Sequence, residues 1–171
     1  MSHSIIVVDY DPQWPELFEA LRAGIATALG DLAAAIEHVG STAVPGLAAK
    51  PVIDIDVLLS PSDGFADAIA RLVPLGYAHR GNLGIAGREA FSQPPAQPAH
   101  HLYVCAPDCS EYRRHIAFRD YLRAHPESAR AYGDLKRSLA SRFGEDRERY
   151  GAGKDEFVNE ILRCAIPPTV E

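Results

Sequence analysis

The stretch 38-HVGSTAVPGLAAKPVIDIDV-57 decides how this chain folds. It places a Gly-Ser pair after an apolar run, then a loop of small residues, then a strand in which two aspartates alternate with isoleucine and valine. Side chains two positions apart on a strand point to the same face, so Asp54 and Asp56 share one face while the branched apolar residues fill the other. The pattern predicts a strand with one face in the core and one face available for chemistry.

Two carboxylates on one face indicate a bound cation. Hard divalent ions such as Mg²⁺ or Mn²⁺ are held by one or two carboxylates, with water and substrate phosphates completing the shell, so Asp54 and Asp56 are candidate metal ligands. The alternative is an edge strand whose aspartates are solvated or salt-bridged. The preceding Gly40-Ser41 favours the first interpretation. Glycine permits unusual backbone angles, and backbone N–H groups and the serine hydroxyl can then approach phosphate oxygens.

Outside this stretch, the chain alternates helical and strand patterns. The strand candidates are "AAAIEHV", "PVIDIDVLL", "GYAHR", "REAFS" and "HHLYVCA", and everything after Asp108 has helical periodicity. This order predicts an α+β fold in which helices flank a mixed β-sheet and the C-terminal third is helical. We expect a single domain over residues 1–171, with a core at about 1–108 and C-terminal helices at about 109–165.

Composition limits the classes of partner. The chain has 171 residues, 47% hydrophobic content, 23% charged content and a formal net charge of −6, which are ordinary values for a globular domain. A mildly acidic protein has no general attraction for nucleic acid, so nucleic acid is an unlikely partner and a small phosphate compound is favoured. No secretory signal is evident, and no segment reaches the roughly 18 apolar residues that span a membrane, so we expect a cytoplasmic protein without membrane contact.

The three cysteines are Cys105, Cys109 and Cys164. Their odd number, without a CxxC pair, predicts neither a disulfide framework nor a zinc site. We expect free, buried thiols, and the sequence assigns them no role.

Several motifs of the chain resemble those of a known family. A Gly-Ser pair followed after about a dozen residues by Asp-x-Asp in an apolar strand is similar to the signature of the nucleotidyltransferase superfamily related to DNA polymerase β. More narrowly, the opening stretch together with "HHLYV", "FRDYLRAHPESARAYGDLKRSLA" and "KDEFVNEIL" resembles the GrpB family, from Asp9 to about Leu162. Relatives in that family also occur fused to dephospho-CoA kinase, which points to a setting in cofactor metabolism.

The resemblance implies a nucleotidyltransferase-like fold in which Gly40 and Ser41 hold a triphosphate and Asp54 and Asp56 bind catalytic Mg²⁺. Active members of the superfamily usually place a third carboxylate on a later strand that faces this pair. The equivalent strand here, "HHLYVCA", has no acid. His101 is the expected occupant of that position, with His100 on the opposite face. His101 could ligate a metal, act as a general base, or be a hydrogen-bonded structural residue.

Five basic residues are further candidates for phosphate binding. Lys50 directly precedes the aspartate strand, Arg80 and Arg88 flank the glycine-rich turn "RGNLGIAGR", and Arg119 and Lys136 belong to the helical motifs that resemble the family. Lysine and arginine can neutralise phosphate, and arginine can bind it through two parallel hydrogen bonds. The alternative for each of them is a solvated surface position.

These features together predict a metal-dependent nucleotidyltransferase. The reaction would move a nucleoside monophosphate from a nucleoside triphosphate to a small-molecule acceptor, with Mg²⁺ or Mn²⁺ as cofactor. The alternative is a catalytically inactive regulatory module of the same fold that binds a nucleotide or a CoA-like phosphate, and the missing third acid favours that alternative. The sequence specifies neither the nucleotide, the acceptor nor the oligomeric state.

Overall fold

A five-stranded mixed sheet forms the centre of the computed structural model, which describes residues 4–60 and 64–166. The strand order is β1-β2-β5-β4-β3, with β2 antiparallel to β1 and parallel to β5. The strands are β1 (Ala33–Val39), β2 (Ile53–Leu59), β3 (Ala78–His79), β4 (Arg88–Ser92) and β5 (His100–Cys105).

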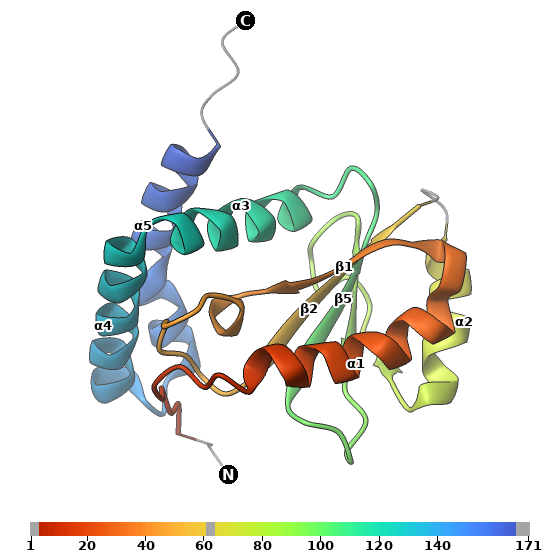
Figure 1. Ribbon diagram of the computed structural model, residues 1–171, viewed down its shortest axis with the longest axis horizontal. Helices are drawn as coiled ribbons and strands as arrows, with labels where there is room; N and C mark the ends of the chain where they lie inside the picture. The colour runs from red at the N-terminus through yellow and green to blue at the C-terminus, as the bar shows by residue number, and fades with distance from the viewer. Residues whose placement is uncertain (1–3, 61–63, 167–171) are drawn as a thin grey trace, which may run out of the picture.

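Within the described residues, five α-helices flank this sheet. They are α1 (Trp14–Leu29), α2 (Phe65–Leu72), α3 (Ser110–Ala124), α4 (Pro126–Phe143) and α5 (Arg147–Ala165). In Figure 1 the sheet lies between α1 and α3, while α4 and α5 stand side by side at the left end of the molecule. The fold is therefore α+β with a helical C-terminal third, as the sequence pattern predicts.

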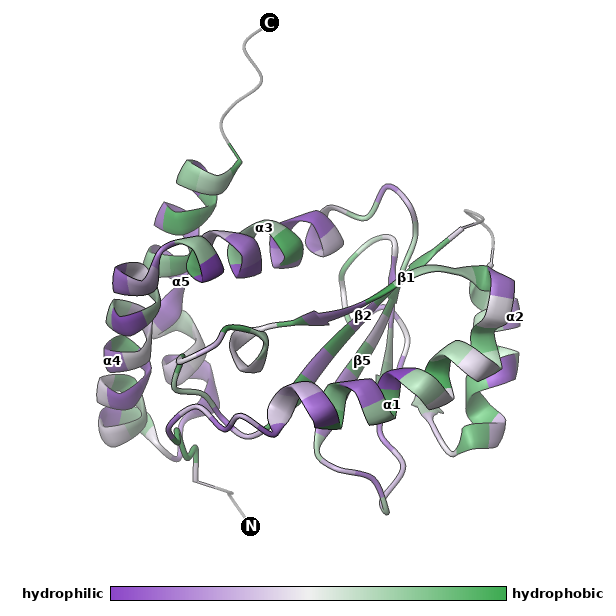
Figure 2. Cartoon of the chain, in the orientation of Figure 1, coloured by the Kyte–Doolittle hydropathy of each residue, from purple (hydrophilic) through white to green (hydrophobic). Residues whose placement is uncertain are grey.

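The main hydrophobic core lies on the face of the sheet that α1 and α2 cover. Ile53, Ile55 and Val57 of β2 are each no more than 2% exposed and pack in this core with Ile25 and Leu29 of α1. Figure 2 shows hydrophobic and hydrophilic residues alternating along α1, as expected for a helix with one buried face. The alternation in β2 consequently leaves its aspartates on the opposite face.

A smaller core joins the C-terminal helices to the loop after β1. Val44 and Leu47 of that loop pack with Leu122 of α3 and with Ala129 and Tyr132 of α4. This packing brings α4 and α5 over the end of the sheet at which the Gly-Ser pair lies.

Strand register brings the predicted motifs together. Because β1 and β2 are antiparallel, the end of β1 lies beside the start of β2, and Val39 pairs with Asp54. Gly40 and Ser41 follow at once and therefore lie next to that aspartate. On the other side of β2, the parallel register places His101 beside Asp54, whereas His100 is 2% exposed and lies on the opposite face, as expected.

Two expectations from the sequence are wrong in detail. The segment "GYAHR" forms a strand only at Ala78–His79, so β3 is a short edge strand. All three cysteines are free, but only Cys105 and Cys109 are buried, while Cys164 is exposed on α5. Among the helices that the structure describes, none has the length and apolar character needed to cross a membrane.

Candidate functional site

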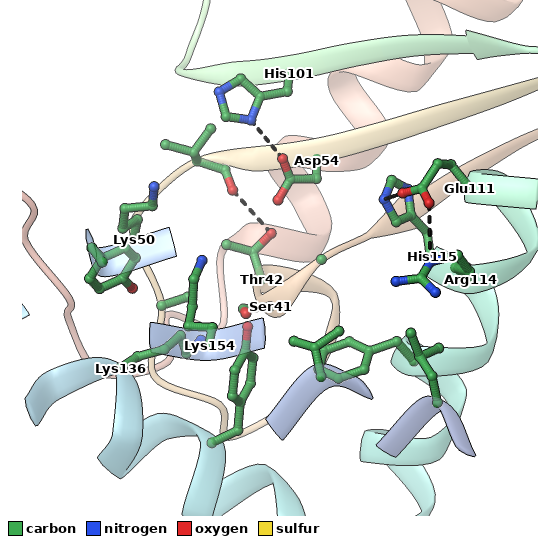
Figure 3. Close-up of a pocket in the computed structure, with 18 residues that line it drawn as sticks. Ser41, Thr42, Lys50, Asp54, His101, Glu111, Arg114, His115, Lys136 and Lys154 are labelled. Atoms are coloured by element: carbon green, nitrogen blue, oxygen red, sulfur yellow. Dashed lines mark hydrogen bonds and ion pairs between the residues drawn. The ribbon is translucent and has the colours of Figure 1, made fainter. Parts of the chain in front are cut away.

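A cavity of about 340 Å³ lies where the loop after β1, the polar face of β2 and the C-terminal helices meet. Figure 3 shows its labelled side chains, with the lysines at one end and the group around His115 at the other. The lining residues are Gly40, Ser41, Thr42, Ala49, Lys50, Val52, Asp54, His101, Glu111, Arg114, His115, Phe118, Tyr132, Lys136, Tyr150, Lys154, Val158 and Leu162.

Gly40 is required by close approach to Asp54. Its φ of +71° lies in the left-handed region, which residues with a Cβ rarely adopt. A Cβ at this position would also overlap Oδ2 of Asp54. The Gly-Ser pair and the aspartate strand are thus fitted against each other, and glycine is the residue that allows it.

Two buried side chains hold the loop that contains Ser41. The hydroxyl of Thr42 donates to the carbonyl oxygen of Val52 at 3.3 Å, so its oxygen accepts from Nε2 of His38 at 2.9 Å. His38 also stacks on Phe18, with ring centroids 4.8 Å apart. Burial lowers the pKa of His38 to about 4, and the ring is therefore neutral at neutral pH. Sequence reasoning missed both anchors, although they belong to the opening motif.

Asp54 lines the cavity and is paired with His101. Nδ1 of His101 lies 2.8 Å from Oδ1 of Asp54, and the two side chains are 53% and 31% exposed. A carboxylate can only accept, so Nδ1 is the donor in this pair.

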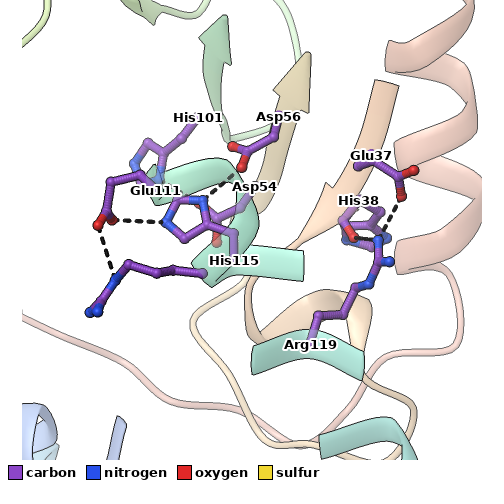
Figure 4. A network of polar contacts seen from close by, with 9 residues as sticks. Glu37, His38, Asp54, Asp56, His101, Glu111, His115 and Arg119 are labelled. Carbon is purple, nitrogen blue, oxygen red and sulfur yellow. Dashed lines mark hydrogen bonds and ion pairs between the residues drawn. The ribbon is translucent and has the colours of Figure 1, made fainter. Parts of the chain in front are cut away.

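Asp56 is paired with a histidine that the sequence analysis did not single out. Its Oδ2 lies 2.7 Å from Nδ1 of His115 on α3 (Figure 4), its side chain is 0% exposed, and its Oδ1 has no hydrogen-bond partner among the residues that the structure describes. Burial raises the pKa of the Asp56 carboxyl, although His115 acts in the opposite direction. Burial opposes a charge on His115, but the hydrogen bond and charge of Asp56 raise the pKa of the imidazole. His115, rather than Asp56, reaches the cavity.

Next to His115, α3 adds an ion pair to the rim of the cavity. Oε2 of Glu111 lies 3.7 Å from Nε2 of His115, and Oε1 lies 3.0 Å from Nε of Arg114. These three residues lie within one turn of a helix that carries no recognisable motif at this point, so the sequence alone gave no signal for them.

Three lysines form the other end of the cavity. Nζ of Lys136 is buried, has no hydrogen-bond partner within residues 4–60 and 64–166, and lies 4.6 Å from the ring centroid of Tyr132. Lys50 and Lys154 lie 5.6 Å and 4.7 Å from the ring centroid of Tyr150. Burial, assisted by the charge of Lys154, lowers the pKa of Lys136 to about 7. Lys50 and Lys136 were candidates from the sequence, whereas Lys154 was missed.

The three candidate arginines do not line this cavity. Arg80 is exposed beyond β3. Arg88 is buried with its guanidinium 4.4 Å from the ring centroid of Tyr103. Arg119 binds Glu37 at 2.7 Å, and this contact ties α3 to β1 (Figure 4). The structure thus gives Arg119 a partner within the protein. Phosphate binding by any of the three arginines remains a prediction, and it would have to take place outside this cavity.

Whether the protein could hold a metal ion depends on which ligand atoms the structure brings together. Within residues 4–60 and 64–166, no group of three or more His, Cys, Asp or Glu side chains is arranged to hold a metal ion. The unpartnered Oδ1 of Asp56, next to Asp54 on the same face, nevertheless fits a hard cation, since a buried carboxylate oxygen requires a donor or a positive charge. The protein could supply two carboxylates, with other ligands from water and phosphate.

Comparison with solved structures places the fold. A crystal structure of the conserved protein GrpB from Enterococcus faecalis superimposes with a TM-score of 0.85 at 35% identity, covering 94% of this chain and 96% of that chain. The Cid1 poly(U) polymerase bound to MgATP superimposes with a TM-score of 0.56 at 11% identity, covering 86% of this chain and 50% of that chain. The fold is therefore nucleotidyltransferase-like.

Comparison with known sequences gives the family. A UPF0157 protein of Pseudomonas aeruginosa is 43% identical over 169 residues, which are 96% of this chain and 69% of that protein. The glutamate-rich protein GrpB of Alkalihalophilus pseudofirmus is 34% identical over 163 residues, which are 92% of this chain and 94% of that protein. The model of the GrpB protein family matches residues 4–163. The chain belongs to the GrpB family.

Proposed function

We propose that this chain is a metal-dependent nucleotidyltransferase that moves a nucleoside monophosphate from a nucleoside triphosphate to a small-molecule acceptor. The observation that carries the proposal is the convergence on one cavity of Gly40-Ser41, Asp54 and the amines of Lys50, Lys136 and Lys154. Positive charge is concentrated at one end and carboxylates at the other, which suits a polyphosphate whose reacting phosphorus lies between them.

The triphosphate occupies the lysine end in this proposal. Backbone N–H groups at Gly40 and Ser41 and the Ser41 hydroxyl bind phosphate oxygens, because the left-handed glycine leaves room for close approach. The unpartnered amine of Lys136 gains an anionic partner, and Lys50 and Lys154 add charge from two other segments. Each lysine rests on a tyrosine ring and is thereby positioned before the ligand arrives.

Asp54 and Asp56 would hold Mg²⁺ or Mn²⁺, and the unpartnered Oδ1 of Asp56 supports this assignment. A divalent ion at this place supplies charge stabilisation for the phosphoryl oxygens during in-line attack. In this proposal His101 takes the place of the third acid, because it lies beside Asp54, and its Nε2 takes the proton of the attacking hydroxyl or amine.

A second candidate is a regulatory module that binds a nucleotide or a CoA-like phosphate without catalysis. His101 in place of a third carboxylate favours it, because an imidazole suits Mg²⁺ less well than an oxygen ligand. In this case the lysine end would bind phosphate as proposed and the aspartates would be structural.

Calorimetric titration with ATP, CTP, GTP and UTP, each in Mg²⁺ and in Mn²⁺, tests the shared part of both candidates. We expect at least one nucleotide to bind. A folded protein that binds none of the four contradicts both. Pyrophosphate release in a screen of pooled acceptors then separates them, since the enzyme releases pyrophosphate and the binding module does not.

A further inference from the structure

All lysines of this chain lie in one place. The sequence has 17 lysines and arginines, of which only Lys50, Lys136 and Lys154 are lysine, and all three line the cavity described above. The other basic residues are arginines, and among the described residues only Arg114 joins the lining. The arginines are therefore spread over exposed and buried positions of the fold, whereas all lysine amines of the chain line this cavity.

This distribution matters because the two side chains differ chemically. A phosphate needs only positive charge and donors, and arginine supplies both with better geometry. What lysine adds is the ability to lose its proton and act as a nucleophile when it is buried or placed beside another cation.

Lys136 has the surroundings that such a nucleophile requires. Its side chain is 3% exposed, its Nζ has no hydrogen-bond partner in the described part of the chain, and it faces the ring of Tyr132 on its own helix. The charged groups around it are Lys154 on α5, Lys50 before β2, Arg137 on α4 and Asp54 on β2, and of these only the aspartate favours the protonated form. With its pKa lowered to about 7, a large share of this amine is neutral at neutral pH.

We propose that Lys136 captures the carbonyl carbon of a phosphorylated aldehyde as an imine, while Lys50 and Lys154 hold the phosphate of that compound. The cavity of about 340 Å³ has the volume of a typical small-molecule site. Lys50 and Lys154 come from different segments and line the same cavity as Lys136 (Figure 3). A compound whose phosphate they hold therefore has its aldehyde group close to a buried amine.

The step needs no additional reactant. The lone pair of the neutral Nζ forms a C–N bond to the carbonyl carbon, the C=O π bond breaks, and the oxygen takes one of the two amine protons to give a neutral carbinolamine. The nitrogen then loses its one remaining proton as the hydroxyl leaves as water, which yields a neutral imine and one water molecule. The reaction is reversible by hydrolysis. It shares the phosphate end with the proposed nucleotide site but depends neither on a metal nor on nucleotidyl transfer.

Pyridoxal 5′-phosphate followed by borohydride reduction tests the proposal. The full chain is incubated with the probe near neutral pH, reduced, and mapped by mass spectrometry, where three lysines and the N-terminal amine are the only amines to assign. We expect one adduct per chain, on Lys136, and at least a tenfold weaker response to pyridoxal, which lacks the phosphate. Adducts spread evenly over Lys50, Lys154 and the N-terminus would overturn the proposal, as would equal labelling by pyridoxal.

Matched variants separate this amine from ordinary ones. Lys136→Arg keeps the charge and removes the nucleophile, so labelling should fall to background in a protein whose circular dichroism is unchanged, and Lys136→Met serves if the arginine does not fit. Arg80→Lys adds an exposed amine outside the cavity, and we expect that amine to stay unlabelled. Labelling of Lys136→Arg at the parental level contradicts the proposal. Aldehyde labelling and nucleotide titration are independent readouts. Labelling of Lys136 in a protein that binds no nucleotide would support imine formation while contradicting the proposed nucleotide binding, so one proposal can fail without the other.

Discussion

The sheet side of the cavity and the wall formed by the C-terminal helices differ in how their charged groups are paired. On the sheet side each aspartate has a histidine partner, with Asp54 in the cavity lining bound to His101 and Asp56 behind it bound to His115 through Oδ2. On the helical wall no described residue forms a hydrogen bond with Nζ of Lys136, and Lys154 rests on a tyrosine ring. The sheet side is prearranged by contacts within the protein, whereas the helical wall contains a buried amine, that of Lys136, without a hydrogen-bond partner among the described residues.

This difference assigns separate tasks to the two sides. Internal pairs fix the position of the carboxylates before any ligand binds, which is the property that a reacting centre requires. Unpaired buried amines cost free energy in the empty protein and recover it when an anion enters. Substitutions on the sheet side should therefore alter geometry, and substitutions on the helical wall should alter binding and its dependence on pH.

The largest effect on stability is expected at Gly40, where the Gly-Ser pair contacts the aspartate strand. Gly40→Ala should lower the free energy of unfolding by about 2–4 kcal/mol, from left-handed backbone strain and overlap with the Asp54 carboxylate. Gly46→Ala is the matched control, because its φ is +79° but a Cβ there meets no described atom within 4 Å. Urea unfolding of both variants isolates the contact with Asp54. Equal losses in the two variants would show that backbone strain alone accounts for the effect.

A smaller, pH-dependent effect is expected on the helical wall. The pKa of Lys136 is about 7 in the folded protein, compared with 10.5 as its ordinary value, so burial of the charged amine destabilises the fold fully below pH 7. Between these two values the unfolded chain holds the proton more tightly, and stability rises with pH. Lys136→Met should therefore be more stable than the parent by about 1–3 kcal/mol near pH 6, with little advantage near pH 10.

Thermal melts of the parent and of Lys136→Met across this range provide the measurement. Groups that do not interact with Lys136 titrate alike in both proteins and cancel in the difference, whereas Lys154, whose charge acts on Lys136, contributes to it. An advantage that is independent of pH would mean that Lys136 does not titrate in this window.

Asp56→Asn should change the stability of the metal-free protein by less than about 1 kcal/mol. The amide oxygen can still accept from His115, and the amide nitrogen replaces an oxygen that has no partner and whose charge is buried. Any stabilisation by millimolar Mg²⁺ or Mn²⁺ should disappear in this variant, since the cation would lose a charged ligand. Melts with EDTA and with each ion check both effects. A parent protein that ignores metal even with nucleotide present would rule out the metal assignment.

The smallest effect is expected for Arg80→Ala. Arg80 is exposed and does not line the cavity, so stability should stay within about 0.5 kcal/mol and nucleotide affinity should be unchanged. Calorimetric titration with the best nucleotide is the test. A clear loss of affinity would return Arg80 to the binding site and require movement of the segment that carries it.

The sequence by itself determined the family, the α+β order and the aspartate strand. These features are encoded locally, because the alternation that buries Ile53 and Ile55 necessarily turns Asp54 and Asp56 to the other face. The fit of Gly40 against Asp54 could also be anticipated, since an antiparallel pair of strands brings the end of one beside the start of the next.

Only the tertiary structure decided which basic residues surround the cavity. Lys154 joins it, and Arg119 is instead bound to Glu37, because the packing of Val44 and Leu47 against α3 and α4 fixes how the helical third lies on the sheet. His115 meets Asp56 from 59 residues away for the same reason. Such contacts depend on long-range packing between amphipathic elements. The apolar face of a helix can pack against a sheet in many orientations, and no local pattern in the sequence specifies which of them occurs.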